Sequence, residues 1–137
     1  IAMDGTYKFN QLGLHAVTSP MWETQEAFAR TLKKGDVFFA ISASGASKRL
    51  IRMAKIVKKQ GGVTVAVTNQ AKSPITEICD HVIITATREH IFYDQVSFTR
   101  MAAMAVIDTL FMLILSMKND FFENVAEHER SVIEEKL

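Results

Sequence analysis

The chain has 137 residues, a length that suits one domain around a single core. Apolar residues make up 48% and charged residues 23%, and 16 basic against 15 acidic side chains leave a net charge of +1. This composition is ordinary for a soluble globular protein. It argues against a DNA-binding surface within these residues, because binding to the phosphate backbone requires clustered lysine and arginine.

Cysteine content and hydropathy indicate where the protein works. A single cysteine, Cys79, excludes an internal disulfide framework and favours a reducing compartment, so we expect a cytoplasmic protein. Residues Ile1 to Asn10 lack the basic segment and apolar run of a signal peptide. The most apolar stretch, Met101 to Met117, is at the short limit for a membrane span and carries Asp108 at its middle. We therefore expect no membrane contact and interpret this stretch as a core helix, or as a helix at a subunit interface.

The chain opens on what resembles the last part of a helix, which reaches Leu12 and is closed by Gly13. Leu14–Val17 follows as a first short strand. The pair Ser19-Pro20 then supplies an N-cap and a first-turn proline for a helix that extends to about Leu32. In a βα unit a strand precedes the first helix, so we expect the first strand and its loop to lie upstream. The 137 residues would then form one N-terminally incomplete domain.

Three more apolar runs predict strands, Val37–Ile41, Val63–Val67 and His81–Ile84. The first of them is apolar throughout, and the hydrophobicity of the runs is continuous rather than alternating, which indicates parallel strands covered by helices on both faces. Residues 46–60 form an amphipathic helix between the first two runs, and Gly61 suits the left-handed position that ends it. The pattern predicts an α/β fold, a three-layer α/β/α sandwich with a parallel sheet and right-handed crossovers.

Helices dominate the remaining sequence. Residues 73–79 form a short helix opened by a Ser-Pro pair, and a long apolar helix runs over about residues 94–117. Asn119 breaks that helix, and a final amphipathic helix begins at about Phe121. Asp108 in the long helix needs a partner if it is buried, and we expect that partner to come from another element or subunit.

The segment that carries chemical information is Ser42–Ser47 (SASGAS), which follows a buried strand and opens a helix. Ligands of open parallel sheets bind outside the carboxyl ends of the strands. A helix N-terminus attracts phosphate through its unpaired amides and partial positive charge, and the serine hydroxyls add neutral donors. Gly45 lets the backbone approach a ligand or take positive φ. From the residues alone, an equally good interpretation is that Ser44 or Ser47 only caps the helix.

Three segments, in chain order, resemble one known family. The string ISASGASK is similar to the S-x-S-G-x-[ST] motif of the SIS (sugar isomerase) fold, and VTVAVTNQAKSPITEICDHVI is similar to the next unit of that fold. The stretch FYDQVSFTRMAAMAVIDTLFMLIL resembles a helix of the RpiR-type transcription factors, which join an N-terminal helix-turn-helix domain to a C-terminal SIS domain. The resemblance extends from about Lys8 to Lys118.

This resemblance implies a site for the phosphate of a sugar or amino sugar. The hydroxyls that it assigns to the phosphate are those of Ser42, Ser44 and Ser47, and the helping backbone amides are those of Ala43, Gly45 and Ala46. The family completes its pocket with a Gly-x-Gly-x-Ser loop after the first strand, and that loop is not in this chain, so we expect an incomplete pocket. Many enzymatic members carry Glu-Thr where this chain has Ala46-Ser47, which removes one candidate base.

Glu89, beside His90 and after the His81–Ile84 run, is a candidate sugar contact or base. The alternative is that both are solvated loop residues. The four histidines show no metal-ligand spacing, so we expect no metal site, and no dinucleotide or nucleotide motif calls for a cofactor.

We therefore expect the sugar-phosphate-binding effector domain of an RpiR-type transcriptional regulator of carbohydrate metabolism, and not an enzyme. It would act as a homo-oligomer, a dimer or tetramer, and would reach DNA only through a helix-turn-helix domain absent from this chain. The alternatives are a phosphosugar isomerase or lyase, and a structural oligomerisation module whose pocket is unused.

Overall fold

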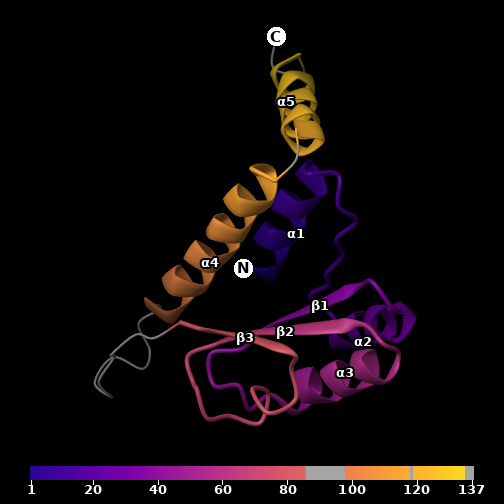
Figure 1. Ribbon diagram of the computed structural model, residues 1–137, viewed down its shortest axis with the longest axis vertical. Helices are drawn as coiled ribbons and strands as arrows, with labels where there is room; N and C mark the ends of the chain where they lie inside the picture. Colours follow the sequence, from indigo (N-terminus) through magenta and orange to yellow (C-terminus); the bar gives the residue numbers. More distant parts are fainter. Residues whose placement is uncertain (86–97, 118, 135–137) are drawn as a thin grey trace. The chain divides into compact units, whose positions relative to one another are not determined.

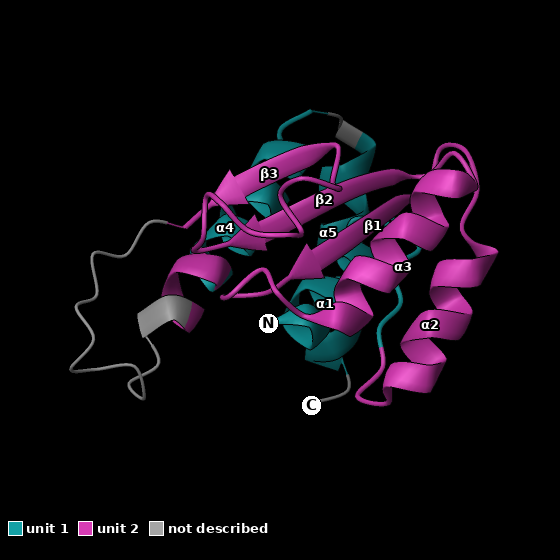
Figure 2. Ribbon diagram, turned by 90° about the horizontal axis from the view of Figure 1, so that it is seen from below, with its two compact units in different colours: residues 1–18, 104–137 teal, residues 19–103 magenta. Residues whose placement is uncertain are grey.

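The computed structural model describes residues 1–85, 98–117 and 119–134. Its helices and strands follow one another along the chain as α1 (Ala2–Gln11), α2 (Trp22–Thr31), β1 (Val37–Ile41), α3 (Lys48–Lys59), β2 (Val63–Thr68), β3 (His81–Ile84), α4 (Phe98–Leu115) and α5 (Asn119–Glu134) (Figure 1). The chain divides into two compact units, one of residues 1–18 with 104–137 and the other of residues 19–103 (Figure 2).

The second unit is built on a parallel sheet with the strand order β1-β2-β3. β1 pairs with β2 from Val37 opposite Val63 to Ile41 opposite Val67, and β2 pairs with β3 in the same direction. All three carboxyl ends therefore lie at one edge of the sheet. The three apolar runs were each predicted as strands and as parallel, and both predictions are confirmed.

Both faces of this sheet are apolar. On one face, Ala40 and Ala66 belong to a buried cluster with Ala54 of α3, and α2 packs beside α3 (Figure 2). The other face carries the alternate residues, among them Phe39 and Val67, because successive side chains of a strand point to opposite sides. Strands with two apolar faces explain why the sequence shows unbroken apolar runs.

α3 forms where the amphipathic pattern predicts it. Met53, Ala54 and Val57 are buried on one side, and the lysines and arginines of the helix are exposed. The helix ends as predicted at Gly61, whose φ of +80° lies in the left-handed region that a residue with a Cβ enters at a cost.

Leu14–Val17 was predicted as a strand, and the prediction is wrong. Both backbone polar groups of Ala16 bond the side chain of Asn10, the amide to Oδ1 and the carbonyl to Nδ2, each at 3.0 Å. Groups that a strand would use for pairing are therefore already occupied, and the segment has no regular structure.

The predicted short helix at residues 73–79 is also absent and is replaced by successive turns. The amide of Thr76 donates to the carbonyl of Ser73, and that of Cys79 donates to the carbonyl of Ile75. The amide of Ile75 instead donates to the carbonyl of Gly45 at 3.1 Å. This bond ties the segment to the loop after β1.

Two helix starts also differ from the prediction. α2 begins at Trp22 with Met21 as its N-cap, and Ser19 instead accepts a hydrogen bond from the amide of Met21. Asn119, predicted to separate two helices, is the first residue of α5. The first residues of the predicted long helix, 94–97, lie outside the described residues.

The first unit contains α1, α5 and most of α4. Gly5 of α1 lies against Ile107 of α4, where a Cβ built on the glycine would be 3.4 Å from the isoleucine. Asp108 of α4 forms an ion pair with Lys8, so its partner comes from another element, as predicted. The pKa of Lys8 is raised because its ammonium group donates hydrogen bonds to two carboxylates, of which Asp108 has the larger effect and Asp4 the smaller.

No single helix among the described residues is long and apolar enough to cross a membrane. α4 and α5 meet the criteria of length and composition only as a pair bent by 113°. The apolar stretch predicted as a core helix is buried on one side only. Ala103 and Ile107 are nearly inaccessible, whereas Met101 and Met112 are 68% and 61% exposed.

Candidate anion-binding site

Polar residues follow each strand at the carboxyl edge of the sheet. β1 leads into the loop Ser42–Ser47, which we call the serine loop, and α3 begins directly after it. β2 ends at Thr68, with Asn69 next, and β3 is followed by Thr85. The hydroxyl of Thr85 donates to the side-chain carbonyl of Asn69. The serine loop therefore lies in a polar surrounding at the edge where parallel sheets bind ligands.

Three carbonyl groups of the serine loop accept hydrogen bonds, and two of them accept from residues outside the loop. The carbonyl of Ala43 accepts hydrogen bonds from the hydroxyl of Thr68 and the amide of Asn69, each at 3.1 Å. The carbonyl of Ser42 accepts from the amide of Gly45, and the carbonyl of Gly45 accepts from Ile75. Since these acceptors are all engaged, the negative end of each of these peptide dipoles is turned away from a prospective anion.

Gly45 allows this loop to lie against the segment after β2. Its φ is +61°, and it is buried. A Cβ at this position would lie 2.2 Å from the hydroxyl oxygen of Ser73 and 3.1 Å from that of Thr68. Both of these partners are almost fully buried and cannot easily move aside. Gly45 was predicted to allow positive φ or a close approach of the backbone, and it has both.

Only some donors of the serine loop remain available, because the amides of Ser42, Gly45 and Ala46 already donate to acceptors within the protein. Ser47 is the N-cap residue of α3, but its side chain makes no capping hydrogen bond. Ser44 accepts only a bond of 3.3 Å from the amide of Ala46. Within the described part of the chain, the hydroxyls of Ser42 and Ser47 and the amides of Ala43, Ser44 and Ser47 make no hydrogen bond. The first amides of α3 add to this set, as at any helix N-terminus.

This geometry argues against the interpretation that Ser47 only caps α3. A capping serine would place its oxygen on an amide of the first helical turn, and Ser47 does not. An uncapped helix N-terminus beside unused hydroxyls is suited to bind an oxyanion, because amide donors and the partial positive charge of the helix act together.

The serine loop itself carries no ionisable side chain, and the nearest cations in sequence are Lys48 and Arg49. The guanidinium of Arg49 lies 4.8 Å from the ring centroid of Trp22, a cation–π contact that holds it on α2. The donors described at the loop are therefore hydroxyls and backbone amides.

Sequence reasoning did not assign Thr68, Asn69, Ser73 or Thr85 to the site. Their position in the sequence could have indicated them. Thr68, Asn69 and Thr85 are polar residues at or directly after the carboxyl end of an apolar strand, and Ser73 follows a few residues later. Glu89 and His90, predicted as a candidate sugar contact and its neighbour, lie outside the described residues.

The free thiol of Cys79 is buried in the protein. Burial is the main cause that raises the pKa of the Cys79 thiol, which fits the predicted small buried side chain rather than a nucleophile. In the described ranges, no group of three or more His, Cys, Asp or Glu side chains could hold a metal ion.

Comparison with known proteins gives a consistent result. Residues 1–113 match the SIS domain family. The chain is 32% identical over 131 residues to an uncharacterized HTH-type transcriptional regulator of Caldanaerobacter subterraneus subsp. tengcongensis. That match covers 93% of this chain and 46% of the relative, so the chain spans about half the length of this curated relative.

Solved structures share the fold. The NanR protein of Vibrio vulnificus, complexed with ManNAc-6P, has a TM-score of 0.86 at 23% identity, over 96% of this chain and 50% of that one. The sugar isomerase domain of an RpiR transcription factor from Sphaerobacter thermophilus has a TM-score of 0.71 at 20% identity, over 94% and 71% of the two chains. A proposed sugar-phosphate isomerase of Listeria monocytogenes has a TM-score of 0.71 at 21% identity, over 96% and 68%.

Proposed function

Because the chain belongs to the SIS domain family, we propose that the serine loop binds the phosphate of a sugar or amino sugar and that the domain is the effector domain of a transcriptional regulator. The observation that carries the proposal is the division of polar groups in the loop. Its carbonyls are engaged by Thr68, Asn69 and Ile75, while its hydroxyls and the first amides of α3 are free to donate.

Each donor has a role in this proposal. The hydroxyls of Ser42, Ser44 and Ser47 donate to phosphate oxygens, and the free amide of Ala43 adds to them. The amides of Gly45 and Ala46, which donate to the carbonyl of Ser42 and the hydroxyl of Ser44, would have to exchange these bonds for the phosphate. Neutral donors at a helix N-terminus stabilise a phosphate without a buried lysine or metal. Such a site suits a sensor, because its ligand must dissociate when its concentration falls.

The regulator role is supported by the curated relative, an HTH-type transcriptional regulator, and by the fold shared with NanR and an RpiR factor. We propose that DNA is contacted through a helix-turn-helix domain outside these residues and that the protein works in the cytoplasm. NanR was complexed with ManNAc-6P, so an N-acetylated amino sugar phosphate is the first ligand to test.

A phosphosugar isomerase is the second candidate, supported by the fold shared with a proposed isomerase. Isomerisation needs a general base within hydrogen-bond reach of the reacting carbon. The described groups around the serine loop are hydroxyls, backbone groups and the amide of Asn69, and none of these is a base at neutral pH. The regulator is therefore the function that we favour.

A thermal shift measurement tests phosphate binding at the serine loop. We expect N-acetylmannosamine 6-phosphate or glucosamine 6-phosphate to raise the Tm of the wild-type chain, and the unphosphorylated sugars to leave it unchanged. At a ligand concentration 100 times Kd the stabilisation is about 2.7 kcal/mol. Ser44→Ala should lose most of the shift, whereas Ser131→Ala on α5, whose hydroxyl bonds the carbonyl of His128, should retain it.

Two outcomes would contradict the proposal. An equal shift in Ser44→Ala and wild type would place the ligand elsewhere, and turnover of the sugar phosphates by the same preparation would favour the isomerase. No shift with any sugar phosphate would leave the structural module as the better interpretation.

A further inference from the structure

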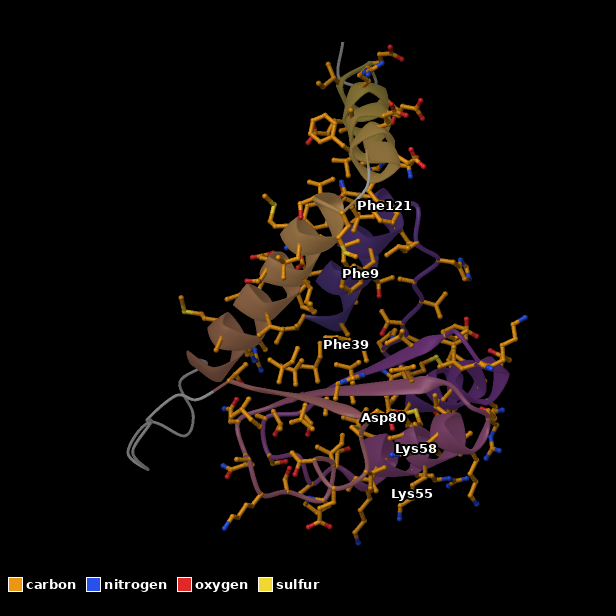
Figure 3. All side chains as sticks on the ribbon, in the orientation of Figure 1. Phe9, Phe39, Lys55, Lys58, Asp80 and Phe121 are labelled. Atoms are coloured by element: carbon orange, nitrogen blue, oxygen red, sulfur yellow. The ribbon has the colours of Figure 1, made fainter. Side chains whose placement is uncertain are left out.

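α3 carries a stripe of cations on its exposed side. Lys48, Arg52, Lys55 and Lys59 line an open groove of about 440 Å³ together with Ile51 and Ile56. The cations recur at helical spacing over about 16 Å of helix. Figure 3 places Lys55 on the side of α3 away from the sheet, whereas Lys58 faces Asp80. We call these four cations and two isoleucines the basic groove.

Most of these cations have no charged partner. Arg52 pairs with Glu26 of α2 at 2.9 Å. Among the described residues, no carboxylate pairs with Lys48, Lys55 or Lys59. The near-neutral net charge predicted no clustered cations, but it conceals this local excess, because the balancing acids lie elsewhere in the chain.

Many of those acids lie on α5. Asp120, Glu123, Glu127 and Glu134 are all exposed and recur along one side of the helix over about 21 Å. We call these four residues the acidic stripe. The face of α5 that contacts α1 is a different one, since Asn124 bonds the carbonyl of Leu12 and His128 bonds Tyr7. Glu123 and Glu127 each precede one of these residues, about 100° around the helix.

α5 also exposes apolar side chains that need a partner. Phe122 and Ile133 are 64% and 59% exposed, which is unusual for large apolar residues that recur on one helix side. A 16-residue helix is marginal by itself and depends on packing for its stability. Its contacts with α1 leave both the acidic stripe and these apolar residues uncovered.

We propose that α5 of a second copy of this chain docks in the basic groove of α3, with its acidic stripe on the cations and its apolar residues against Ile51 and Ile56. The two stripes are similar in length and opposite in charge. In a two-fold dimer the contact is made twice, once by each α5, which doubles the buried surface without a second kind of interface. This inference is independent of phosphate binding at the serine loop.

A helix fits the basic groove better than a nucleic acid does. The groove has an isoleucine on either side of its row of cations, and the charged sugar-phosphate backbone offers much less apolar surface to cover them than an amphipathic helix does. Protein–DNA interfaces instead surround their cations with polar donors to phosphate. The amphipathic, acidic α5 offers both the charge and the apolar surface.

Charge reversal and charge exchange test this docking. The dimer dissociation constant of the full chain is measured by analytical ultracentrifugation for the wild type, for Lys55→Glu/Lys59→Glu, for Glu123→Lys/Glu127→Lys, and for the variant with all four changes. We expect each double reversal to weaken the dimer more than tenfold, and the combined variant to recover most of the wild-type affinity. Raising the salt concentration should weaken the wild-type dimer, because exposed charges are screened.

The matched control is Lys33→Glu/Lys34→Glu, which makes the same charge change in the exposed turn after α2 and should leave the dimer unchanged. Circular dichroism verifies that each variant is folded. A wild-type chain that stays monomeric overturns the proposal, and so does a combined variant as weak as either double reversal. Loss of binding to a short DNA duplex in Lys55→Glu/Lys59→Glu, with dimerisation intact, would assign the groove to nucleic acid instead.

Discussion

Ser47 is the residue at which a structural and a functional interpretation of the serine loop differ most. It occupies the N-cap position of α3 without bonding any amide of the helix. Ser73, by contrast, is 6% exposed and donates to the carbonyl of Gln70 at 3.1 Å. One serine is thus unused by the fold and the other is built into it, although the two are of the same type and belong to the same edge of the sheet.

This difference predicts opposite responses to the loss of a hydroxyl. Ser47→Ala should change the free energy of unfolding in urea by less than about 0.5 kcal/mol, because a capping serine would lose about 1 kcal/mol. Ser73→Ala should lose about 1 kcal/mol, because the almost fully buried hydroxyl of Ser73 no longer bonds the carbonyl of Gln70. Ser47→Ala should nevertheless weaken the stabilisation by sugar phosphate. A loss of about 1 kcal/mol without ligand would mean that Ser47 does cap α3.

At the scale of elements, Asp80 fixes the register between β2 and β3. Its carboxylate accepts hydrogen bonds from the amide and the hydroxyl of Thr64, at 2.9 and 2.8 Å, and pairs with Lys58 of α3 at 2.9 Å. Figure 3 shows Asp80 and Lys58 on the same side of the sheet. We call these contacts of Asp80 with Thr64 and Lys58 the Asp80 clamp. The clamp lies at the start of β2 and β3, so it sets which residues meet at the carboxyl ends of these strands, where the serine loop lies.

The clamp predicts a specific pH dependence. Lys58, and then the bonds from Thr64, hold the pKa of Asp80 well below its usual range. A carboxyl whose pKa is lower in the folded state stabilises the fold above its unfolded pKa, about 3.9, and loses that contribution as pH falls further. Thermal unfolding should therefore find Asp80→Asn less stable than wild type at pH 7, with the gap closing below about pH 4.

The exposed carboxylate of Glu23 on α2 provides the comparison. Glu23→Gln should differ from wild type by much less than Asp80→Asn does at pH 7, because, among the described residues, no such clamp holds this side chain. An Asp80→Asn variant as stable as wild type at pH 7 would mean that the clamp does not set the stability of the sheet.

At the scale of the whole molecule, exposed apolar surface supports our proposal that the protein is a homo-oligomer. Met101, Met112 and Met117 of the α4 region are 61–74% exposed, and α5 adds Phe122 and Ile133. Exposed apolar side chains in this number are expected to mark interaction surfaces. In the regulator that we propose, the effector would bind one arrangement of subunits better than another, which would couple the serine loop to these surfaces.

That coupling is testable in the full-length regulator, including the proposed DNA-binding domain. We expect the sugar phosphate identified by thermal shift to change the affinity for operator DNA by about 5- to 150-fold, in one direction, as is typical of allosteric coupling. Ser44→Ala should bind DNA as the wild type does without ligand and should lose the response. Fluorescence anisotropy at fixed salt measures both, and a wild type whose DNA affinity is unaffected by the ligand would contradict the sensor role.

The sequence alone determined the strands, the parallel α/β class, α3 and the position of the serine loop. These features depend on local signals: unbroken apolar runs, the helical spacing of Met53, Ala54 and Val57, and glycines where positive φ is needed. The family resemblance also followed from local strings. The phosphate-binding roles of the three serines remain a prediction.

Only the tertiary structure decided how distant groups are used. Leu14–Val17 is apolar enough for a strand, yet Asn10 takes the polar groups of Ala16. The segment at Ser73 opens like a helix in the sequence, yet it forms successive turns, and its Ile75 amide donates to the carbonyl of Gly45 in the serine loop. Such choices depend on which partner is closer in space, and one-dimensional patterns do not record that distance.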